Sequence, residues 1–287
     1  MYYGIYASIA GDCADAHTLA GLARDAEGAG WDGFFIWDHI SRYSDSGMVD
    51  PWIALAAIAI NTERIRIGPM VTPLPRRRPW KVARETASLD NLSGGRMVLG
   101  VGLGVPENRR DFEYLGEPSD AKVRATMLDE ALDVLTGLWS GEPFSYRGQH
   151  YRLKETLFLP TPIQSPRIPI WVAGMWPKKA PFRRAARWDG VFPLKLGLDE
   201  RLKPEDLRDI LTYIKKHRAG GMVFDVVHSG VTSGRDREQD ADMVARYAEV
   251  GVTWWLEVTW LQKDIEKWRP SSLEEMQARI RRGPPKV

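Results

Sequence analysis

A regular alternation of short apolar segments with amphipathic ones constrains the fold of this chain more than any other feature. The apolar segments, such as GFFIWDHI (33–40), are hydrophobic along most of their length, which is typical of strands buried on both faces. Each is followed by residues whose apolar side chains recur at helical spacing. Eight such pairs begin at residues 2, 33, 64, 96, 168, 190, 222 and 253. Eight pairs in 287 residues predict a (β/α)8 TIM barrel rather than an open doubly wound sheet.

One stretch interrupts the alternation before the fifth strand. Residues 141–167, GEPFSYRGQHYRLKETLFLPTPIQSPR, are rich in proline and in strand-forming residues. We interpret them as an insertion that forms a hairpin. Elsewhere no linker, composition shift or low-complexity tract divides the chain, so the sequence predicts one barrel domain over residues 1–287.

Composition and charge narrow the class of protein. The net charge of +2, from 40 basic and 38 acidic residues, gives no field that would attract nucleic acid or an anionic membrane. The longest strongly apolar run, PWIALAAIAI (51–60), is shorter than the roughly 20 residues that cross a bilayer. The N-terminus lacks the features of a signal peptide, and the single cysteine, Cys13, suits a reducing compartment. We therefore expect a cytoplasmic protein that acts on a small molecule.

The second predicted strand ends in a charged pair, Asp38 and His39. Charged groups are costly in a core, and the unperturbed pKa of histidine lies near physiological pH. A strand that surfaces and solvates the pair is the plain alternative. In a (β/α)8 barrel, however, the active site is built at the C-terminal ends of the strands, so the barrel fold favours a functional pair. We call the C-terminal end of the barrel its mouth. Other positions expected there are Met70, Val71, Thr72, Gly102, Gly104, Ala173, Gly174, Met175, Pro193, His228 and Glu257.

Other arrangements of reactive residues give weaker signals. The five histidines include no HExxH motif and no close pair at ligand spacing, so we expect no metal site. In TWWLEVTW, the aromatic residues Trp254, Trp255 and Trp260 alternate as a strand would, and we interpret them as barrel packing rather than a ligand stack. Glu257 lies inside the same strand. A buried carboxylate there needs a partner or a raised pKa, and it is a candidate acid or base.

Several motifs in order along the chain resemble the luciferase-like family of flavin-dependent oxidoreductases and monooxygenases, which includes enzymes that use the deazaflavin coenzyme F420. The resemblance runs from GIYAS to about VFPL and is weaker afterwards. No single motif is specific, and GVGLG does not have the GxGxxG spacing of a dinucleotide fold. The motifs are WDHI, RIRIGPMVTPLPRRRP joined to SLDNLSGGRMVLGVGLG, FSYRGQHYRLKETLFLPTPIQSPRIPIWVAG and RRAARWDGV.

The resemblance assigns roles at the start of the barrel. It places Asp38 and His39 at the positions of the family's acidic residue and active-site histidine. Met70-Val71 matches a non-proline cis peptide beneath the isoalloxazine ring of many members, with an ordinary trans bond as the alternative. We expect His39 to act as proton donor or acceptor, while Asp38 orients it or contacts the ring.

The resemblance also assigns contacts to the rest of the cofactor. Arg124 matches an arginine that contacts flavin phosphate in some members, although a solvated residue at a helix start is the alternative. The residues Ala173, Gly174, Met175 and Trp176 match a loop after the fifth strand that lies along the cofactor tail. With Thr72, Gly102 and Gly104 they complete the expected cofactor site, and the family implies a homodimer.

Two positions depart from the family's sugar-phosphate dehydrogenases. Those enzymes carry a glutamate just after the glycines of the fourth strand, where this chain has Val105, and a tryptophan where it has Tyr43. The luciferases place an arginine near Val105, which is also missing. Tyr43 therefore replaces the family's catalytic aromatic residue, and oxidation of a sugar phosphate is not expected.

The basic run PRRRPWK, with Arg76, Arg77, Arg78 and Lys81, follows the third predicted strand. It is either a solvated loop or a site that attracts an anionic tail, which coenzyme F420 has and FMN largely lacks. The second interpretation gives a slight preference for F420.

The sequence thus predicts a flavin-type oxidoreductase. It would transfer a hydride through coenzyme F420, or hydroxylate a small organic substrate through reduced FMN and oxygen. A flavin-binding protein of the same fold without turnover is one alternative, and an unrelated barrel enzyme such as a metal-dependent lyase is another.

Overall fold

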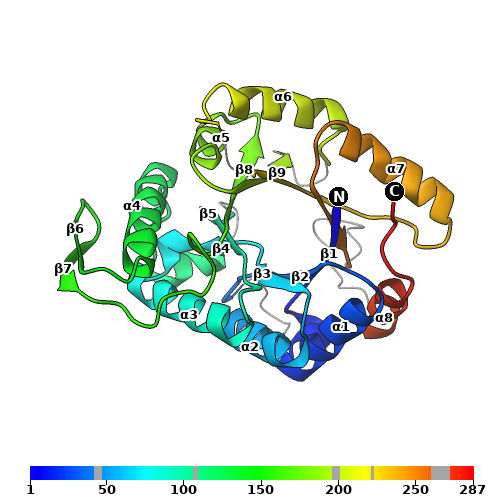
Figure 1. Ribbon diagram of the computed structural model, residues 1–287, viewed down its shortest axis with the longest axis horizontal. Coiled ribbons are helices and arrows are strands. Elements are labelled where there is room, and N and C mark those ends of the chain that lie inside the picture. Colours follow the sequence, from blue (N-terminus) through cyan, green and yellow to red (C-terminus); the bar gives the residue numbers. More distant parts are fainter. Residues whose placement is uncertain (42–46, 106–108, 196–200, 221–222, 260–271) are drawn as a thin grey trace.

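The strands form a nearly closed ring surrounded by helices in the computed structural model, which describes residues 1–41, 47–105, 109–195, 201–220, 223–259 and 272–287 (Figure 1). The parallel strands are β1 (Tyr2–Ala7), β2 (Gly33–Ile36), β3 (Arg66–Pro69), β4 (Thr72–Pro73), β5 (Leu99–Gly102), β8 (Ile170–Trp176), β9 (Gly190–Lys195), β10 (Asp225–Gly230) and β11 (Trp254–Val258). The helices are α1 (Ala16–Gly28), α2 (Pro51–Asn61), α3 (Pro79–Leu92), α4 (Ala121–Trp139), α5 (Ala180–Ala185), α6 (Pro204–Lys215), α7 (Arg237–Glu249) and α8 (Leu273–Arg281).

The order of the strands confirms the predicted barrel. The sheet runs β3-β2-β1-β11-β10-β9-β8-β5-β4, and a parallel bridge between Ile67 and Met97 joins its two ends. Only Met70 and Val71 separate β3 from β4 along the chain, so the two segments together count as one of eight barrel strands. Gly68 permits the closure, because a Cβ at this position would lie 1.9 Å from the carbonyl oxygen of Val98. Every strand predicted from the alternation is present.

The predicted insertion is also confirmed as a hairpin. Strands β6 (Phe144–Arg147) and β7 (Arg152–Thr156) pair antiparallel and project from the side of the barrel beside α4 (Figure 1). Buried Asp90 of α3 anchors the segment that follows by accepting hydrogen bonds from the backbone N–H groups of Ile163 and Gln164. Glu130 of α4 accepts from three consecutive N–H groups, 149–151, in the hairpin turn. Both contacts place carboxylates against backbone donors that would otherwise lack a partner.

Side chains alternate between two cores along each strand. In β11, Trp254 and Leu256 point into the barrel, whereas Trp255 and Glu257 point toward the helices. The packing role predicted for Trp254 and Trp255 is therefore confirmed, while Trp260 lies outside the described residues. Burying a large apolar side chain contributes about 1.5–3 kcal/mol. The barrel interior contains Phe35, Met70, Val98, Trp171, Phe192, Val227, Trp254 and Leu256.

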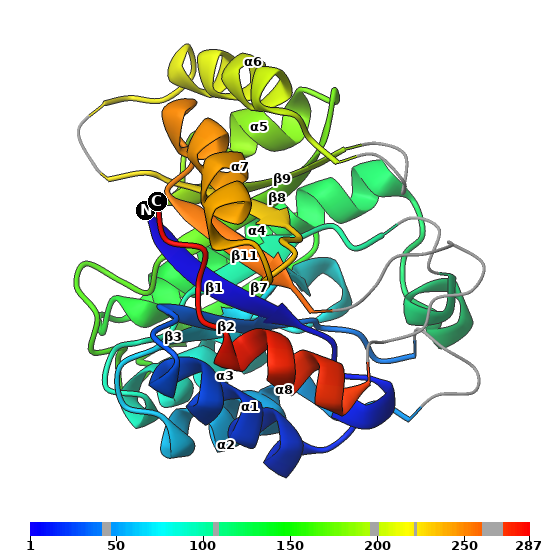
Figure 2. The same ribbon diagram turned by 90° about the vertical axis from the view of Figure 1, so that its right-hand side faces the viewer.

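The two ends of the chain meet on one side of the barrel. The N–H of Val287 donates to the hydroxyl of Tyr3 at 2.9 Å, and helix α8 packs beside α1 (Figure 2).

Several helices start at side chains that cap their first N–H groups, as Asp50 does for α2 and Ser272 for α8. Of the helices in the described ranges, none has both the length and the apolar character needed to span a bilayer.

Candidate active site

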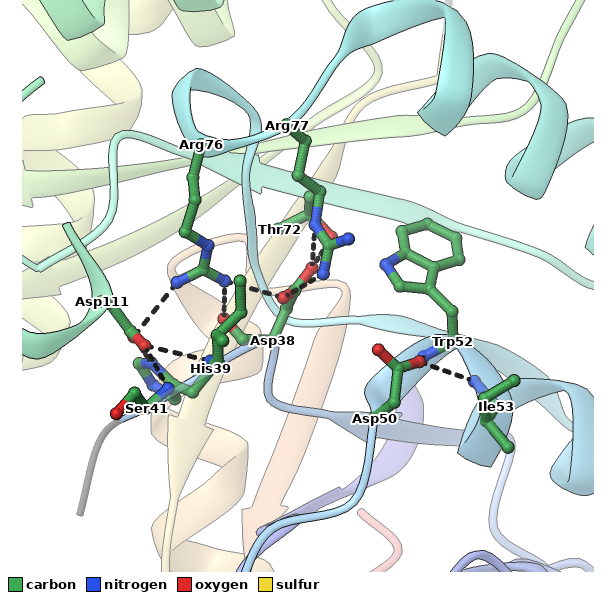
Figure 3. Close-up of polar contacts among 11 residues, drawn as sticks. Asp38, His39, Ser41, Asp50, Trp52, Ile53, Thr72, Arg76, Arg77 and Asp111 are labelled. Carbon is green, nitrogen blue, oxygen red and sulfur yellow. Dashed lines mark hydrogen bonds and ion pairs between the residues drawn. The ribbon is translucent and has the colours of Figure 1, made fainter. Parts of the chain in front are cut away.

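Asp38 lies two residues beyond the end of β2 and is buried. Its carboxylate accepts a hydrogen bond from Thr72 Oγ1 at 2.8 Å and forms ion pairs with Arg76 and Arg77 at 2.9 and 2.7 Å (Figure 3). Desolvating one carboxylate is costly, and two guanidinium groups offset that cost. The charge of Asp38 is thus neutralised within the protein.

The predicted role of the basic run as a tail-binding site is wrong for Arg76 and Arg77. Their side chains are only 1% and 16% exposed and point toward Asp38 rather than into solvent. The short turn Leu74–Arg76 after β4 directs them inward, and a run of like charges in the sequence carries no information about that direction. Arg78 and Lys81 remain exposed, and Lys81 pairs with Glu85 at 2.7 Å.

His39 pairs with a residue that the sequence did not single out, Asp111. Its Nδ1 lies 2.5 Å from Asp111 Oδ2, while Oδ1 accepts from the N–H groups of Ile40 and Ser41 at 3.0 and 2.8 Å. Asp111 lies in a short turn (Arg109–Asp111) in the loop after β5. The prediction that Asp38 orients His39 is therefore wrong, because Asp111 does so. Contact between Asp38 and a cofactor ring stays a prediction.

Arg76 links the two carboxylates. Its Nη1 lies 3.2 Å from Asp111, and its Nη2 lies 2.9 Å from Asp38 (Figure 3). Four side chains are thus in contact one after another, in the order His39, Asp111, Arg76 and Asp38. Burial acts to raise the pKa of Asp111, but the hydrogen bond from His39, its charge, the Ser41 N–H and Arg76 hold that pKa well below its usual range. Asp111 is therefore an ionised acceptor for the imidazole. We call Asp38, His39, Arg76, Arg77 and Asp111 the mouth cluster.

The predicted cis peptide between Met70 and Val71 is confirmed. It lies between β3 and β4, and the hydroxyl of Tyr6 donates to the Met70 carbonyl at 2.5 Å. Val71 is partly buried over the interior core, as are Tyr6, Ala173 and Leu194. Tyr6, Ala173 and Leu194 come from three different strands, and with Val71 they form an apolar floor at the C-terminal end of the barrel.

The other residues predicted for this end of the barrel contribute mostly to its framework. Thr72 is fully buried and donates to Asp38. A Cβ at Gly102 would lie 3.0 Å from Val71 Cγ2, so the missing side chain keeps space next to the apolar floor. Gly104 has φ +82°, and a Cβ there would come within 2.4 Å of the Phe112 ring. Gly104 is therefore required by its backbone conformation and by packing.

Arg124 is buried in the first turn of α4, so its alternative interpretation as a solvated residue is wrong. Its Nη1 donates to the Leu103 carbonyl at 3.2 Å, and its guanidinium lies 4.5 Å from the centre of the Phe112 ring. The charge thus lies beside the loop that follows β5. A contact with a phosphate stays a prediction.

Residues Ala173 to Trp176 lie within β8 and not in a loop after it, contrary to the prediction. They pair with β9 as far as Trp176 and Lys195. Alternation places Ala173 and Met175 on the inner side, whereas Gly174 faces α5, where a Cβ would lie 2.5 Å from Pro181. The inner pair is therefore the part of this segment that faces the mouth.

The structure does not bring Glu257 to the mouth. The residue is fully buried on the outer face of β11, where it accepts from Thr232 N at 2.7 Å, Trp255 Nε1 at 2.9 Å and Arg279 Nε at 3.3 Å. Burial raises its pKa, although Arg279 opposes the shift. An acid or base role for Glu257 in this site is not supported, because its side chain lies on the outer face of the strand. The sequence alone did not determine which face of the strand Glu257 occupies. We call Thr232, Trp255, Glu257 and Arg279 the α8 cluster.

Further expectations from the sequence concern His228, Tyr43, Cys13 and a metal site. His228 also faces the helices, stacked on Tyr247 with ring centres 4.3 Å apart, and burial with a smaller effect of Arg201 lowers its pKa to about 3. Tyr43 lies outside the described residues. Burial raises the pKa of the Cys13 thiol to about 12, with a smaller contribution from Asp12, so the thiolate is not available. Within the described ranges, no three His, Cys, Asp or Glu side chains could share a metal ion.

Comparison with protein families and curated proteins extends these observations. A family model described as luciferase-like monooxygenase matches residues 4–285. An uncharacterized protein of Mycobacterium tuberculosis is 35% identical over 216 residues, which cover 69% of this chain and 70% of that protein. An F420-dependent glucose-6-phosphate dehydrogenase of Microbacterium testaceum is 33% identical over 187 residues, which cover 63% of this chain and 53% of that enzyme.

Solved structures share the fold at low sequence identity. An F420-dependent secondary alcohol dehydrogenase in complex with an F420-acetone adduct superposes with a TM-score of 0.76 and 18% identity, over 90% of this chain and 92% of that one. The oxygenating component of 3,6-diketocamphane monooxygenase of Pseudomonas putida, in complex with FMN, gives a TM-score of 0.61 and 20% identity, over 80% and 65%. Deazaflavin and flavin enzymes are thus both represented among the similar folds.

Proposed function

This chain belongs to the luciferase-like monooxygenase family, and from that premise we propose that it is an oxidoreductase that binds coenzyme F420 or FMN at the C-terminal mouth and uses His39 as acid or base. The observation that carries the proposal is the pair of His39 Nδ1 and Asp111 Oδ2, which lie 2.5 Å apart in the loops that follow two barrel strands, β2 and β5. An imidazole held by an ionised carboxylate is suited to proton transfer near neutral pH.

The residues at the mouth fit a flat cofactor ring. Tyr6, Val71, Ala173 and Leu194 offer an apolar floor, and Gly102 has no side chain to fill the space next to it. The buried guanidinium of Arg124, beside the Leu103 carbonyl, is the proposed phosphate contact. A cofactor of this class supplies hydride transfer as a deazaflavin, or activation of oxygen as reduced FMN.

The roles of the chain's own side chains follow from the mouth cluster. Asp111 holds Nδ1 of His39, so any proton that His39 exchanges with a ligand passes through Nε2. The ionised carboxylate favours the imidazolium that forms when His39 takes up a proton. Arg76 fixes Asp111 in turn, and the contact of Arg76 with Asp38 ties this arrangement to the end of β2.

We propose coenzyme F420 ahead of FMN, on grounds that differ from the sequence argument. The basic run no longer supports the choice, since Arg76 and Arg77 bind Asp38. Support comes instead from the relatives and from the similar fold that are named as F420-dependent. Val105, where the family's sugar-phosphate dehydrogenases have glutamate, favours a small organic substrate other than a sugar phosphate.

Titration of the purified protein with F420 and, separately, with FMN tests the proposal. Binding should perturb the absorbance spectrum of one cofactor and raise the melting temperature, because a ligand that binds only the folded state stabilises it. If neither cofactor changes either quantity, the proposed function is lost. Binding without turnover of any alcohol, ketone or oxygen-dependent substrate would favour the alternative of a flavin-binding protein without chemistry.

We further propose a homodimer. Helix α2 has no charged residue and exposes Ile53 and Ile60 by 63% and 68%, and α3 exposes Leu92 by 50%. Apolar side chains that gather on neighbouring helices commonly mark an interface. Sedimentation of Ile53→Lys/Ile60→Lys should show a monomer where the wild-type protein sediments as a dimer. A monomeric wild-type protein would contradict the proposal.

Two broader features of the prediction stay proposals. The family model spans nearly the whole chain, which supports one barrel domain over residues 1–287. We propose a cytoplasmic location because the only cysteine, Cys13, is buried and cannot form an internal disulfide.

A further inference from the structure

A pocket lies on the outer side of the sheet, between α8, the loop that follows β10 and the end of β11. Its volume is about 470 Å³, within the roughly 300–1,000 Å³ typical of small-molecule sites. Three arginines line it, Arg235, Arg279 and Arg282. No residue of the mouth cluster is among its lining residues, so the pocket is separate from the proposed active site.

Arg279 is held in a fixed position in the wall of this pocket. Its Nη2 donates to Thr232 Oγ1 at 2.7 Å and its Nη1 to the Gly283 carbonyl at 2.9 Å, while Nε lies 3.3 Å from Glu257. Gly234 has φ +61°, and a Cβ there would lie 2.9 Å from Arg279 Cδ, so the loop after β10 closes tightly on this side chain. A guanidinium ordered in this way loses little entropy when it binds a ligand.

The pocket has more positive charge than its own carboxylates neutralise. Glu257 is matched by Arg279, and Glu275 accepts from Ser272 N at 3.0 Å in the capping box of α8. Within the described residues, Arg235 and Arg282 form no ion pair and no side-chain hydrogen bond. The pocket is therefore lined by three guanidinium groups and two carboxylates, and two of these guanidinium groups have no side-chain partner among the described residues.

We propose that this pocket binds a phosphoryl group, either inorganic phosphate or the phosphate of a small soluble metabolite, independently of the redox cofactor. Guanidinium groups bind phosphate oxygens through paired N–H donors, and the side chains of Arg235 and Arg282 have no partner among the described residues that would compete for these donors. The location agrees with this chemistry. Barrels of this class frequently bind phosphate at the loops after the last two strands, and residues 231–233 and 235 of this pocket follow β10, the seventh barrel strand.

Isothermal titration of the full chain with inorganic phosphate at constant ionic strength tests the proposal. The variant Arg235→Ala/Arg282→Ala should bind phosphate at least roughly tenfold more weakly than the wild-type protein, because it loses charge-assisted contacts. Both side chains are exposed, so its melting temperature without phosphate should stay unchanged. Arg237→Ala removes an exposed arginine of α7 outside the pocket and should bind as the wild-type protein does. Equal affinity in all three proteins, or no binding by the wild-type protein, would overturn the proposal.

Further titrations test the chemical class of the ligand and the independence of the two sites. Acetate should bind much more weakly than phosphate, and equal affinity for acetate would overturn the assignment to a phosphoryl group. Protein saturated with F420 or FMN should bind phosphate with unchanged affinity. Displacement of phosphate by either cofactor would overturn the independence of the two sites. His39 does not line this pocket, so the variant His39→Ala should bind phosphate with wild-type affinity. This result is expected even if the proposed redox function fails.

Discussion

Two buried sets of carboxylates and arginines in this molecule differ in whether they contact a group that solvent can reach. In the mouth cluster, Asp111 is ionised and contacts His39, whose side chain is 17% exposed. In the α8 cluster, Glu257 is fully buried and its oxygens accept from Thr232, Trp255 and Arg279. In the first set, the ionised carboxylate contacts His39, a titratable side chain near solvent. In the second set, the ion pair joins strand β11 to helix α8. A buried ion pair is therefore informative about function only when its outermost member can meet a ligand.

The position of each carboxylate along its strand explains the difference. Asp38 and His39 follow the last residue of β2, where the chain leaves the sheet at the C-terminal mouth. Glu257 lies one residue before the end of β11, and the alternation that sends Leu256 inward sends Glu257 toward α8. A shift of one residue along the strand would have reversed this orientation.

Replacement of His39 should have the largest effect on activity. His39→Ala should lower kcat by about 100-fold to 10,000-fold, the range for a positioned acid or base, and leave cofactor affinity within a few fold. Steady-state kinetics and a cofactor titration measure the two quantities. His217→Ala, which removes an exposed histidine of the loop after α6, serves as the control. Weakened cofactor binding with unchanged kcat would make His39 a binding residue only.

Replacement of Glu257 should change stability instead of activity. Glu257→Gln removes a charge that receives hydrogen bonds in the α8 cluster, and we expect a loss of about 1.5–3 kcal/mol in the free energy of unfolding. Urea unfolding measures this loss. Turnover per folded molecule should stay within about twofold, because Glu257 faces away from the mouth. A large loss of kcat with unchanged stability would restore Glu257 as an acid or base and erase the contrast between the clusters.

Asp111 should affect activity less than His39 but through the same group. Asp111→Asn should lower kcat by roughly 10-fold to 100-fold, as expected when the partner that orients a functional histidine is lost. The limb of the pH profile that reports the imidazole should move to lower pH, because a nearby carboxylate favours the imidazolium. Glu113→Gln, an exposed carboxylate two residues away that pairs with Arg109, is the matched control. A pH profile that does not move would reduce Asp111 to a packing role.

His228 gives the smallest expected effect and tests whether histidines on the helix side differ from His39. Burial, with a smaller effect of Arg201, lowers its pKa to about 3, whereas the unfolded chain titrates near 6.5. Between these values the unfolded state binds a proton that the folded state does not, so stability is lost as the pH falls. His228→Phe keeps a ring beside Tyr247 and should lose roughly 2 kcal/mol less than the wild-type protein between pH 7 and pH 5. Urea unfolding at the two pH values measures this, and equal losses would contradict it.

The sequence predicted the barrel well because buried parallel strands have a period and an apolar character that local patterns record. It placed all eight barrel strands, the hairpin of β6 and β7, and the cis peptide at Met70 that the family resemblance implied. It missed Asp111 as the partner of His39, because 72 positions separate them and only the closed ring brings their loops together. The one available signal was that both residues follow predicted strand ends.

The errors share a physical cause, which is the direction in which a side chain points. Arg77 was expected to face solvent or an anionic cofactor tail and Glu257 to face the mouth, yet the first turns inward to Asp38 and the second outward to α8. A short turn and the parity of a strand decide these directions, and single residues in a sequence do not reveal them.

The arginine shared by two carboxylates has a consequence for the evolution of this chain. Because Arg76 contacts both Asp38 and Asp111, the loss of any one of the three leaves at least one buried charge with one ion-pair partner fewer. Substitutions at these positions should be strongly non-additive, and two that remove opposite charges together should cost less than the separate losses predict. Natural variants are therefore expected to change positions 38, 76 and 111 jointly or not at all. Such covariation would link the loops after β2, β4 and β5 across family members that otherwise differ.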